Sequence, residues 1–413
     1  MVTITGTSVE EVYSIELLRR LKLRGVISLA FSPDGKKLVA IEGDHLHRRA
    51  SSVSLRSVHN PARPSLLLQR KNYVNASKAK FSPRGILALA DGDILRVIDE
   101  SNSNEIISIR TAHKRIYSIA ISPDGTLLAL GGKDGSISIR DVSSKKPIYL
   151  DRFSAHRGIV YSLSFSIDGH LLASGGRDSM IHIRSLGERP ILVARVEMKN
   201  AVNALEFSPY DKLLASAFSF YLSAFSRLQS MKIGLIDLST SYTPTTNLIA
   251  LEAPINDLSF SPDGNLIALA SDDGRIGILD VSGKPKISKR LDGHEARLLS
   301  IAFSPSGDLL ISGGEDKLGV WRVKRIATGE RYKRDIEIED RESMLYKRKI
   351  RLSWLLRYYE RNPIGALYAA SENGLLKILL EKLVERNMIV KLDDERYEIP
   401  KPMPMPRGAK RIA

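Results

Sequence analysis

Residues 118–130 read SIAISPDGTLLAL, and this stretch decides the fold of the chain. Two short apolar segments flank the tetrapeptide Ser-Pro-Asp-Gly. Proline presets φ at the first central position of a turn and glycine tolerates the positive φ that follows, so the two segments are predicted to pair as a hairpin. A third segment, residues 135–142 (GSISIRDV), alternates apolar with small or polar side chains at the period of two expected of a strand.

The same unit returns seven times along the chain. Its apolar residue before the turn serves as an anchor, and successive anchors are 50, 40, 44, 42, 53 and 43 residues apart. The anchors are Phe31, Phe81, Ile121, Phe165, Phe207, Phe260 and Phe303. Repeats of about 40 to 45 residues, each forming a four-stranded sheet, are typical of a β-propeller. We therefore predict an all-β fold: a seven-bladed β-propeller of four-stranded blades.

These repeats resemble those of the WD-repeat (WD40) family, and the resemblance covers residues 12–323. It implies that a blade holds a His from the loop entering it, a Ser or Thr on its second strand, an Asp in the next turn and a Trp on its third strand. Blade seven carries all four, and blade four has Arg184 in place of Trp. The matching residues are His294, Ser312, Asp316 and Trp321 in blade seven, and His156, Ser174 and Asp178 in blade four. The resemblance gives them a structural role, joining parts of the propeller through buried hydrogen bonds.

The set of His, Ser or Thr, Asp and Trp is here called the tetrad, and the other blades keep fewer of its members. Blade three keeps only the His and the Asp, and blade six keeps only Asp273. The four places in blade three are occupied by His113, Leu130, Asp134 and Arg140. We expect blades one, two, five and six to depend more on apolar packing. In blade seven, Trp321 follows Asp316 by one residue fewer than in the sister blades, which leaves the geometry there open.

A ring needs a connection between its first and last blades. By the same resemblance, residues 12–23 (VYSIELLRRLKL) supply the outer strand of blade seven and close the ring. The run ELLRRL is also compatible with a frayed terminal helix, so both readings stay open.

Two blades are long because the turn between their second and third strands is expanded. The expansion in blade one, residues 43–52, presents His45, His47, Arg48 and Arg49. The expansion in blade five, residues 217–230, presents Phe218, Phe220, Tyr221 and Phe225. Exposed loops rarely carry so many aromatic residues, so the blade-five segment either packs on its own blade or binds a partner. The two histidines lack a third ligand, so no metal site is expected.

After residue 323 the sequence becomes charged and helical. Residues 324–342 are predicted to be a charged linker, and residues 343–400 form helices followed by a small hairpin at 388–392 and 396–399. This segment resembles a winged helix, and a basic tail rich in Pro and Met, residues 401–413, follows it. Its candidate phosphate contacts are Lys347, Arg348, Lys349, Arg351, Arg407, Lys410 and Arg411. A solvated helix and tail is the alternative.

Net charge, missing motifs and hydropathy exclude several classes of function. The net charge is +15, of which +8 lies in residues 322–413, so acidic or polyanionic partners are favoured. There is no cysteine, and no phosphate-binding, metalloprotease or esterase motif occurs, so we expect no enzyme, cofactor, metal or small-molecule substrate. No apolar run is long enough for a membrane span, which predicts a cytoplasmic protein without membrane contact. Scarce thermolabile side chains are typical of heat-adapted proteins.

Three functions remain. The first is a non-enzymatic scaffold that docks protein partners of a larger assembly on the propeller face, the rim and the C-terminal module. The second is a nucleic-acid- or ribonucleoprotein-associated factor that holds phosphates nonspecifically through the basic C-terminal region. The third, a propeller hydrolase, has no carboxylate pair in the sequence to support it. The scaffold is the preferred hypothesis.

Overall fold

The computed structural model divides into two compact units, Met1–Thr328 and Gly329–Ala413. It describes residues 12–23, 25–44, 49–70, 75–99, 105–144, 146–187, 189–209, 213–218, 231–238, 245–251, 253–326, 390–391 and 397–398.

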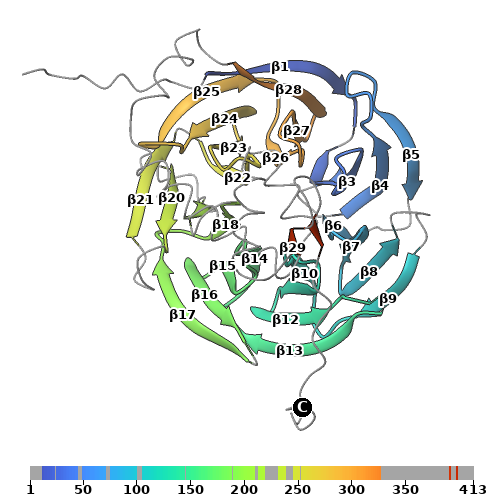
Figure 1. Ribbon diagram of the computed structural model, residues 1–413, viewed down its shortest axis with the longest axis vertical. Helices are drawn as coiled ribbons and strands as arrows, with labels where there is room; N and C mark the ends of the chain where they lie inside the picture. The colour runs from blue at the N-terminus through green and yellow to red at the C-terminus, as the bar shows by residue number, and fades with distance from the viewer. Residues whose placement is uncertain are drawn as a thin grey trace, which may run out of the picture. The chain divides into compact units, whose positions relative to one another are not determined.

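The first unit is a ring of seven antiparallel four-stranded sheets, as predicted (Figure 1). Blade one contains β2 (Val26–Phe31), β3 (Lys37–Asp44), β4 (Arg49–Ser57) and β5 (Ser65–Arg70). Blade two contains β6 (Ala76–Phe81), β7 (Ile86–Asp91), β8 (Ile94–Asp99) and β9 (Glu105–Arg110). Blade three contains β10 (Ile116–Ile121), β11 (Leu127–Gly132), β12 (Ser136–Asp141) and β13 (Ile148–Ser154).

The remaining blades repeat this order. Blade four contains β14 (Val160–Phe165), β15 (Leu171–Gly176), β16 (Met180–Leu186) and β17 (Pro190–Glu197). Blade five contains β18 (Val202–Phe207), β19 (Leu213–Phe218), β20 (Met231–Asp237) and β21 (Thr245–Leu251). Blade six contains β22 (Ile255–Phe260), β23 (Leu266–Ser271), β24 (Arg275–Asp280) and β25 (Lys286–Asp292). Blade seven contains β26 (Leu298–Phe303), β27 (Leu309–Gly314), β28 (Leu318–Ile326) and β1 (Val12–Leu21).

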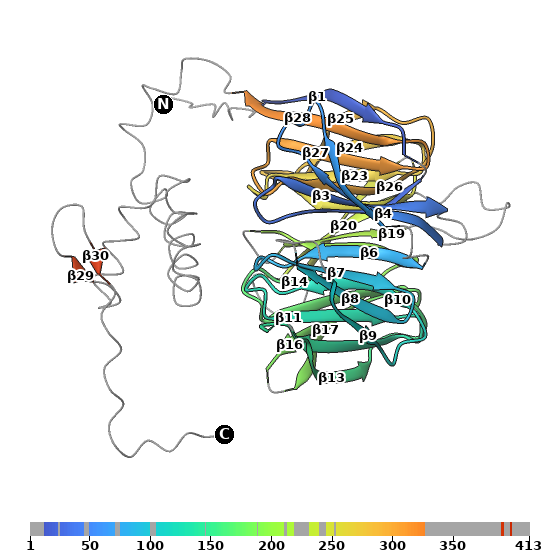
Figure 2. The ribbon, with the colours of Figure 1, turned by 90° about the vertical axis from the view of Figure 1, so that its right-hand side faces the viewer.

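The Ser-Pro-Asp-Gly turns form as their residue types demand. In blade three, the Gly125 amide donates to the Ser122 carbonyl over 2.8 Å, and Gly125 has a φ of 70°. The Thr126 amide donates to Asp124 Oδ1 over 3.0 Å. These turns join the first and second strands of a blade, so with the third-to-fourth connections they form one face of the ring, here called the turn face (Figure 2). The loops entering the blades and the turns between second and third strands form the opposite face, here called the loop face.

The core lies between neighbouring blades. One apolar cluster joins blades one and two, with Ile41 and Leu89 both fully buried, and another joins blades six and seven around Ile276 and Leu310. Each sheet is too small to bury its own faces, so each gains a core only from its neighbours. Closing the ring therefore completes the core that blades one and seven share.

Strand β1 provides the closure, and the alternative of a terminal helix is wrong. It pairs antiparallel with β28 from Val12 opposite Ile326 to Leu21 opposite Leu318, with a bulge between Leu17 and Arg19. The Tyr13 hydroxyl also donates to Asp263 Oδ2 of blade six over 2.9 Å. The first strand in the chain thus completes the last blade.

In the second unit, β29 (Val390–Lys391) pairs antiparallel with β30 (Tyr397–Glu398). These strands form within the hairpin expected at 388–392 and 396–399. The predicted helices of the winged-helix-like segment and the basic tail lie outside the described residues, so that resemblance stays a prediction.

Candidate functional site

In blade seven, four side chains form one continuous hydrogen-bond network. Trp321 Nε1 donates to Ser312 Oγ over 2.9 Å, and Ser312 Oγ lies 2.8 Å from His294 Nε2. The other ring nitrogen, His294 Nδ1, lies 2.7 Å from Asp316 Oδ1. Because Ser312 accepts from the indole, its own proton can go to Nε2, and Nδ1–H then donates to the carboxylate. The network joins the entering loop, both middle strands and the turn between them.

The ionisation states suit this structural network. Burial lowers the pKa of His294 and outweighs the neighbouring Asp316, which would raise it. Burial opposes ionisation of Asp316, but hydrogen bonds from the Glu295 amide and from His294 hold its pKa below the usual value. At neutral pH the pair is therefore a neutral imidazole and a carboxylate, with the polar atoms on both directed into the blade.

The short spacing between Asp316 and Trp321 reflects a tighter turn. In blade seven Gly313 pairs with Leu318, whereas in blade four Gly175 pairs with Ile181, one residue further along. The sister turns have a residue with positive φ, such as Ser179 at 64°, and this is the residue that blade seven lacks. Trp321 still pairs with Leu310 as Arg184 pairs with Leu172, so it occupies the tetrad position and only 3% of it is exposed.

Blade four has a different solution at the Trp position. His156 Nε2 lies 2.8 Å from Ser174 Oγ and Nδ1 lies 2.9 Å from Asp178 Oδ1, as in blade seven. The His182 ring stacks on His156 with centroids 4.6 Å apart, and the Arg184 guanidinium lies 4.7 Å from the ring centroid of Phe153. Burial, followed by the charges of His156 and Arg184, lowers the pKa of His182 to about 4. Burial also lowers the pKa of Arg184, to about 10.

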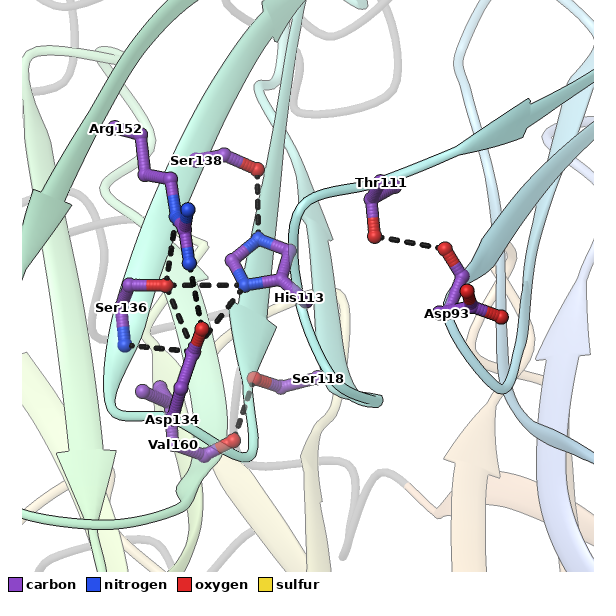
Figure 3. Close-up of polar contacts among 9 residues, drawn as sticks. All are labelled: Asp93, Thr111, His113, Ser118, Asp134, Ser136, Ser138, Arg152 and Val160. Carbon is purple, nitrogen blue, oxygen red and sulfur yellow. Dashed lines mark hydrogen bonds and ion pairs between the residues drawn. The ribbon is translucent and has the colours of Figure 1, made fainter.

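Blade three replaces a tetrad member that sequence reasoning counted as lost (Figure 3). Leu130 occupies the Ser position, but it pairs with Ser138 on β12, and Ser138 Oγ lies 2.9 Å from His113 Nε2. A second hydroxyl, Ser136 Oγ, donates to Asp134 Oδ1 over 2.8 Å. The signal was present in the alternation of GSISIRDV, which places both serines on one side of β12. In blade three the hydroxyl that contacts the histidine therefore comes from the third strand, β12, instead of the second strand.

Inner strands are joined around the ring by a further set of polar contacts. The Leu205 amide donates to Ser162 Oγ over 2.9 Å, and the Phe260 amide donates to Glu206 Oε2 over 2.9 Å. The Leu29 amide donates to Ser300 Oγ over 3.2 Å and joins blade one to blade seven. Burial raises the pKa of Glu206 to about 7, against the opposing attraction of Lys80. Polar side chains of the inner strands therefore serve contacts between blades.

The loop face carries charge that differs between blades at equivalent positions. Gly43 in blade one and Gly92 in blade two donate a backbone hydrogen bond from the turn between second and third strands to the loop entering their blade, and four further turns donate the same bond from a charged residue. The donors are Lys133 in blade three, Arg177 in blade four, Asp272 in blade six and Glu315 in blade seven, with N–O distances of 2.8, 2.9, 2.9 and 3.1 Å. The same fold position is thus basic on one side of the ring and acidic on the other.

The rim carries large exposed apolar side chains on outer strands. Blade three presents three consecutive ones on β13, and neighbouring blade four presents one on β17. These are Ile148 at 59% exposed, Tyr149 at 54%, Leu150 at 50% and Ile191 at 65%. Further exposed residues are Leu66 and Leu67 on β5 and Leu248 on β21.

One partner-binding candidate is corrected by the structure. Strand β19 continues to Phe218, which is 4% exposed and belongs to the core cluster between blades four and five. For Phe218 the packing alternative is therefore the one observed. Phe220, Tyr221, Phe225, His45, His47 and Arg48 lie outside the described residues, and of Arg49 only the backbone, in β4, is described. The seven phosphate-contact candidates also lie outside them.

Comparison with known proteins agrees with this geometry. The family "WD domain, G-beta repeat" matches residues 104–141, 147–185, 243–280 and 285–321, each containing the outer strand of one blade and three strands of the next. The chain is therefore a seven-bladed β-propeller that carries WD40 repeats. No curated protein matches it.

A chain in the structure titled "Crystal Structure of Mitotic Checkpoint Complex" is similar in fold. It has a TM-score of 0.63 and 19% sequence identity, and the match covers 78% of this chain and 96% of that one. At this identity the similarity shows the fold alone.

No group of three or more His, Asp or Glu side chains in the described part of the chain could hold a metal ion. No helix there is long and apolar enough to cross a membrane.

Proposed function

We propose that this protein is a non-enzymatic scaffold that docks protein partners of a larger assembly on its loop face, its rim and its C-terminal module. The rim of blades three and four carries the proposal, because Ile148, Leu150 and Ile191 are at least half exposed there. Large apolar side chains that are exposed on a folded surface in this number are candidates for protein-interaction sites.

The polar groups of the ring support a scaffold rather than an enzyme. His113, His156 and His294 each contact a hydroxyl and a carboxylate within their own blade. Burial lowers the pKa of all three, so each is held neutral in a structural network. The fold similarity to a chain from a structure named for a complex is in keeping with this role.

A pair of rim variants tests the proposal. Ile148→Asp/Ile191→Asp introduces charge into the rim of blades three and four, and Leu248→Asp makes the same kind of change on blade five, where the side chain is 45% exposed. Proteins recovered with each tagged full-length variant are identified and then re-tested as purified components. We expect a component that binds the wild type and Leu248→Asp but not the double variant. Equal binding of every recovered component to all three proteins would contradict the proposal.

A further inference from the structure

We infer that the loop face of blades three and four binds an acidic segment of a protein partner. The inference rests on the proposed scaffold function and adds the chemistry of one partner. The site, here called the basic face patch, consists of Lys114, Arg115, Lys133, Arg157 and Arg177. All but the half-buried Arg115 are exposed.

The patch is one continuous surface across two blades. The Lys133 amide donates to the Arg115 carbonyl, which places the blade-three turn against its entering loop. Gly135, in the same turn, has a φ of 79° and abuts the carbonyls of His156 and Gly158 in the loop entering blade four. A Cβ on Gly158 would lie 3.6 Å from the Cβ of Arg177, so the Arg177 side chain passes over that loop.

The two carboxylates within this surface already have partners. Asp134 Oδ2 accepts from Arg152 Nη2 over 2.6 Å, and its Oδ1 accepts from Ser136. Asp178 accepts from His156 and, over 2.8 Å, from the Arg157 amide. They are mostly covered, with side-chain exposures of 22% and 12%. The outward charge of the patch is therefore positive and attracts anions.

The opposite side of the loop face limits the size of the anion. Glu295 in blade seven occupies the place of Arg157, since both amides donate to the Asp of their tetrad, and Glu315 occupies the place of Arg177. Blade six adds Asp272 at that same turn position. Cations lie beside two of these carboxylates, with Lys317 Nζ 3.5 Å from Glu295 Oε1 and Arg297 Nε 4.0 Å from Asp272 Oδ2, so this side of the face is mixed in charge. Only a short acidic segment confined to the basic face patch would meet outward charge of one sign.

The aromatic residues of the patch also favour a peptide over nucleic acid. Tyr117 and Tyr161 pack edge to face with centroids 6.2 Å apart and an interplanar angle of 77°, and the Arg115 guanidinium lies 5.7 Å from the Tyr117 centroid. Both rings are half-buried. Single-stranded nucleic acid binds where aromatic faces are open to stack on bases, whereas the half-buried Tyr117 ring packs edge to face with Tyr161 and has the Arg115 guanidinium over it.

Charge reversal tests the site. The variant Lys133→Glu/Arg157→Glu/Arg177→Glu places acidic residues at the positions that Glu295 occupies in the entering loop and Glu315 occupies in the turn of blade seven. The control Lys36→Glu/Lys146→Glu/Lys284→Glu makes an equal number of reversals at exposed turn-face positions. The probes are a short fluorescent polyglutamate peptide and an oligothymidylate of equal length. Their fluorescence anisotropy is measured with each full-length protein at low and physiological salt.

We expect the wild type and the turn-face control to bind the peptide alike and the loop-face variant to bind it at least about tenfold more weakly. Arg177→Glu alone, expected to weaken binding about threefold, gives the answer if the triple variant does not fold. Any one of three results would overturn the inference. They are equal weakening by both triple variants, no binding of the peptide to the wild type, and loop-face-dependent binding of the oligonucleotide in preference to the peptide. The rim variant should bind the peptide normally, so failure of this site and failure of the rim proposal are distinguishable.

Discussion

Replacing Ser312 by alanine should destabilise the propeller far more than the loss of one hydroxyl suggests. Ser312 is fully buried, and its Oγ contacts both Trp321 Nε1 and His294 Nε2. Ser312→Ala therefore leaves two buried ring nitrogens without this partner. A buried polar group without a partner costs about 1–3 kcal/mol, so the expected loss of unfolding free energy is about 2–6 kcal/mol.

Ser216→Ala is a matched control. Ser216 lies on the second strand of blade five, is fully buried, and pairs with Gly234 as Ser312 pairs with Gly319. Its hydroxyl donates to the Gly234 carbonyl over 3.2 Å, and no histidine occurs in the loop that enters blade five. Removing it breaks an ordinary hydrogen bond, so the loss should be about 1 kcal/mol.

Guanidinium unfolding of both variants, followed by tryptophan fluorescence and circular dichroism, measures the difference. The two signals must coincide for the free energies to be comparable. Equal losses for the two serines would refute the reasoning, because the tetrad would then contribute no more than a single hydroxyl. A loss below about 1 kcal/mol for Ser312→Ala would refute it as well.

Three further predictions concern blade four and the closure of the ring. The unfolded chain titrates His182 near its ordinary pKa of about 6.5, whereas the folded pKa is about 4. The unfolded state therefore binds more protons as the pH falls from 6.5 to 4, and stability should drop there by up to about 3 kcal/mol. His182→Phe should flatten the pH profile of thermal unfolding, and an unchanged slope would contradict this cause. In blade seven Gly319 leaves room for Trp321, but in blade four His182 occupies the position of Gly319, so Arg184→Trp alone should destabilise the protein. Adding His182→Gly should recover stability in a double-mutant cycle, and additive losses would be contrary evidence. Deletion of residues 1–21 removes β1 and should lower the melting temperature markedly, whereas deletion of residues 1–11 should not; equal melting temperatures would show that β1 is not the closure.

The ring could be predicted because it depends on local chemistry that repeats. Each Ser-Pro-Asp-Gly turn or variant of it fixes a hairpin, and seven such turns spaced 40 to 53 residues apart fix the blade count. The strand at residues 12–23 was expected from the resemblance to WD repeats, with a terminal helix as the open alternative. Its helical alternative failed because pairing with β28 overrides the helix preference of ELLRRL.

The hydrogen-bond network of a blade could be predicted only where each tetrad residue occupies the same position in the repeat as in blade seven. Ser138 was missed because it contributes its hydroxyl from the strand opposite Leu130, and this depends on strand register. Phe218 was misassigned because composition alone does not show where β19 ends. The charge difference between Lys133 and Glu315 was overlooked, although aligning the repeats would have placed both residues in the same turn.

Under the proposed scaffold function, the comparison between blades indicates which residues would set specificity. The tetrad positions differ in residue type between blades, but the histidine keeps a hydroxyl partner. His113 contacts a hydroxyl on β12 and His156 contacts one on β15, and in both cases the side chains stay inside the blade. Partners do not reach these atoms. What a partner meets is the residue beside them, and there the blades differ in sign, with Arg157 following His156 and Glu295 following His294. A repeat that keeps its interior contacts can change this neighbouring residue at little cost in stability, so the difference in charge between blades is free to be selected for binding.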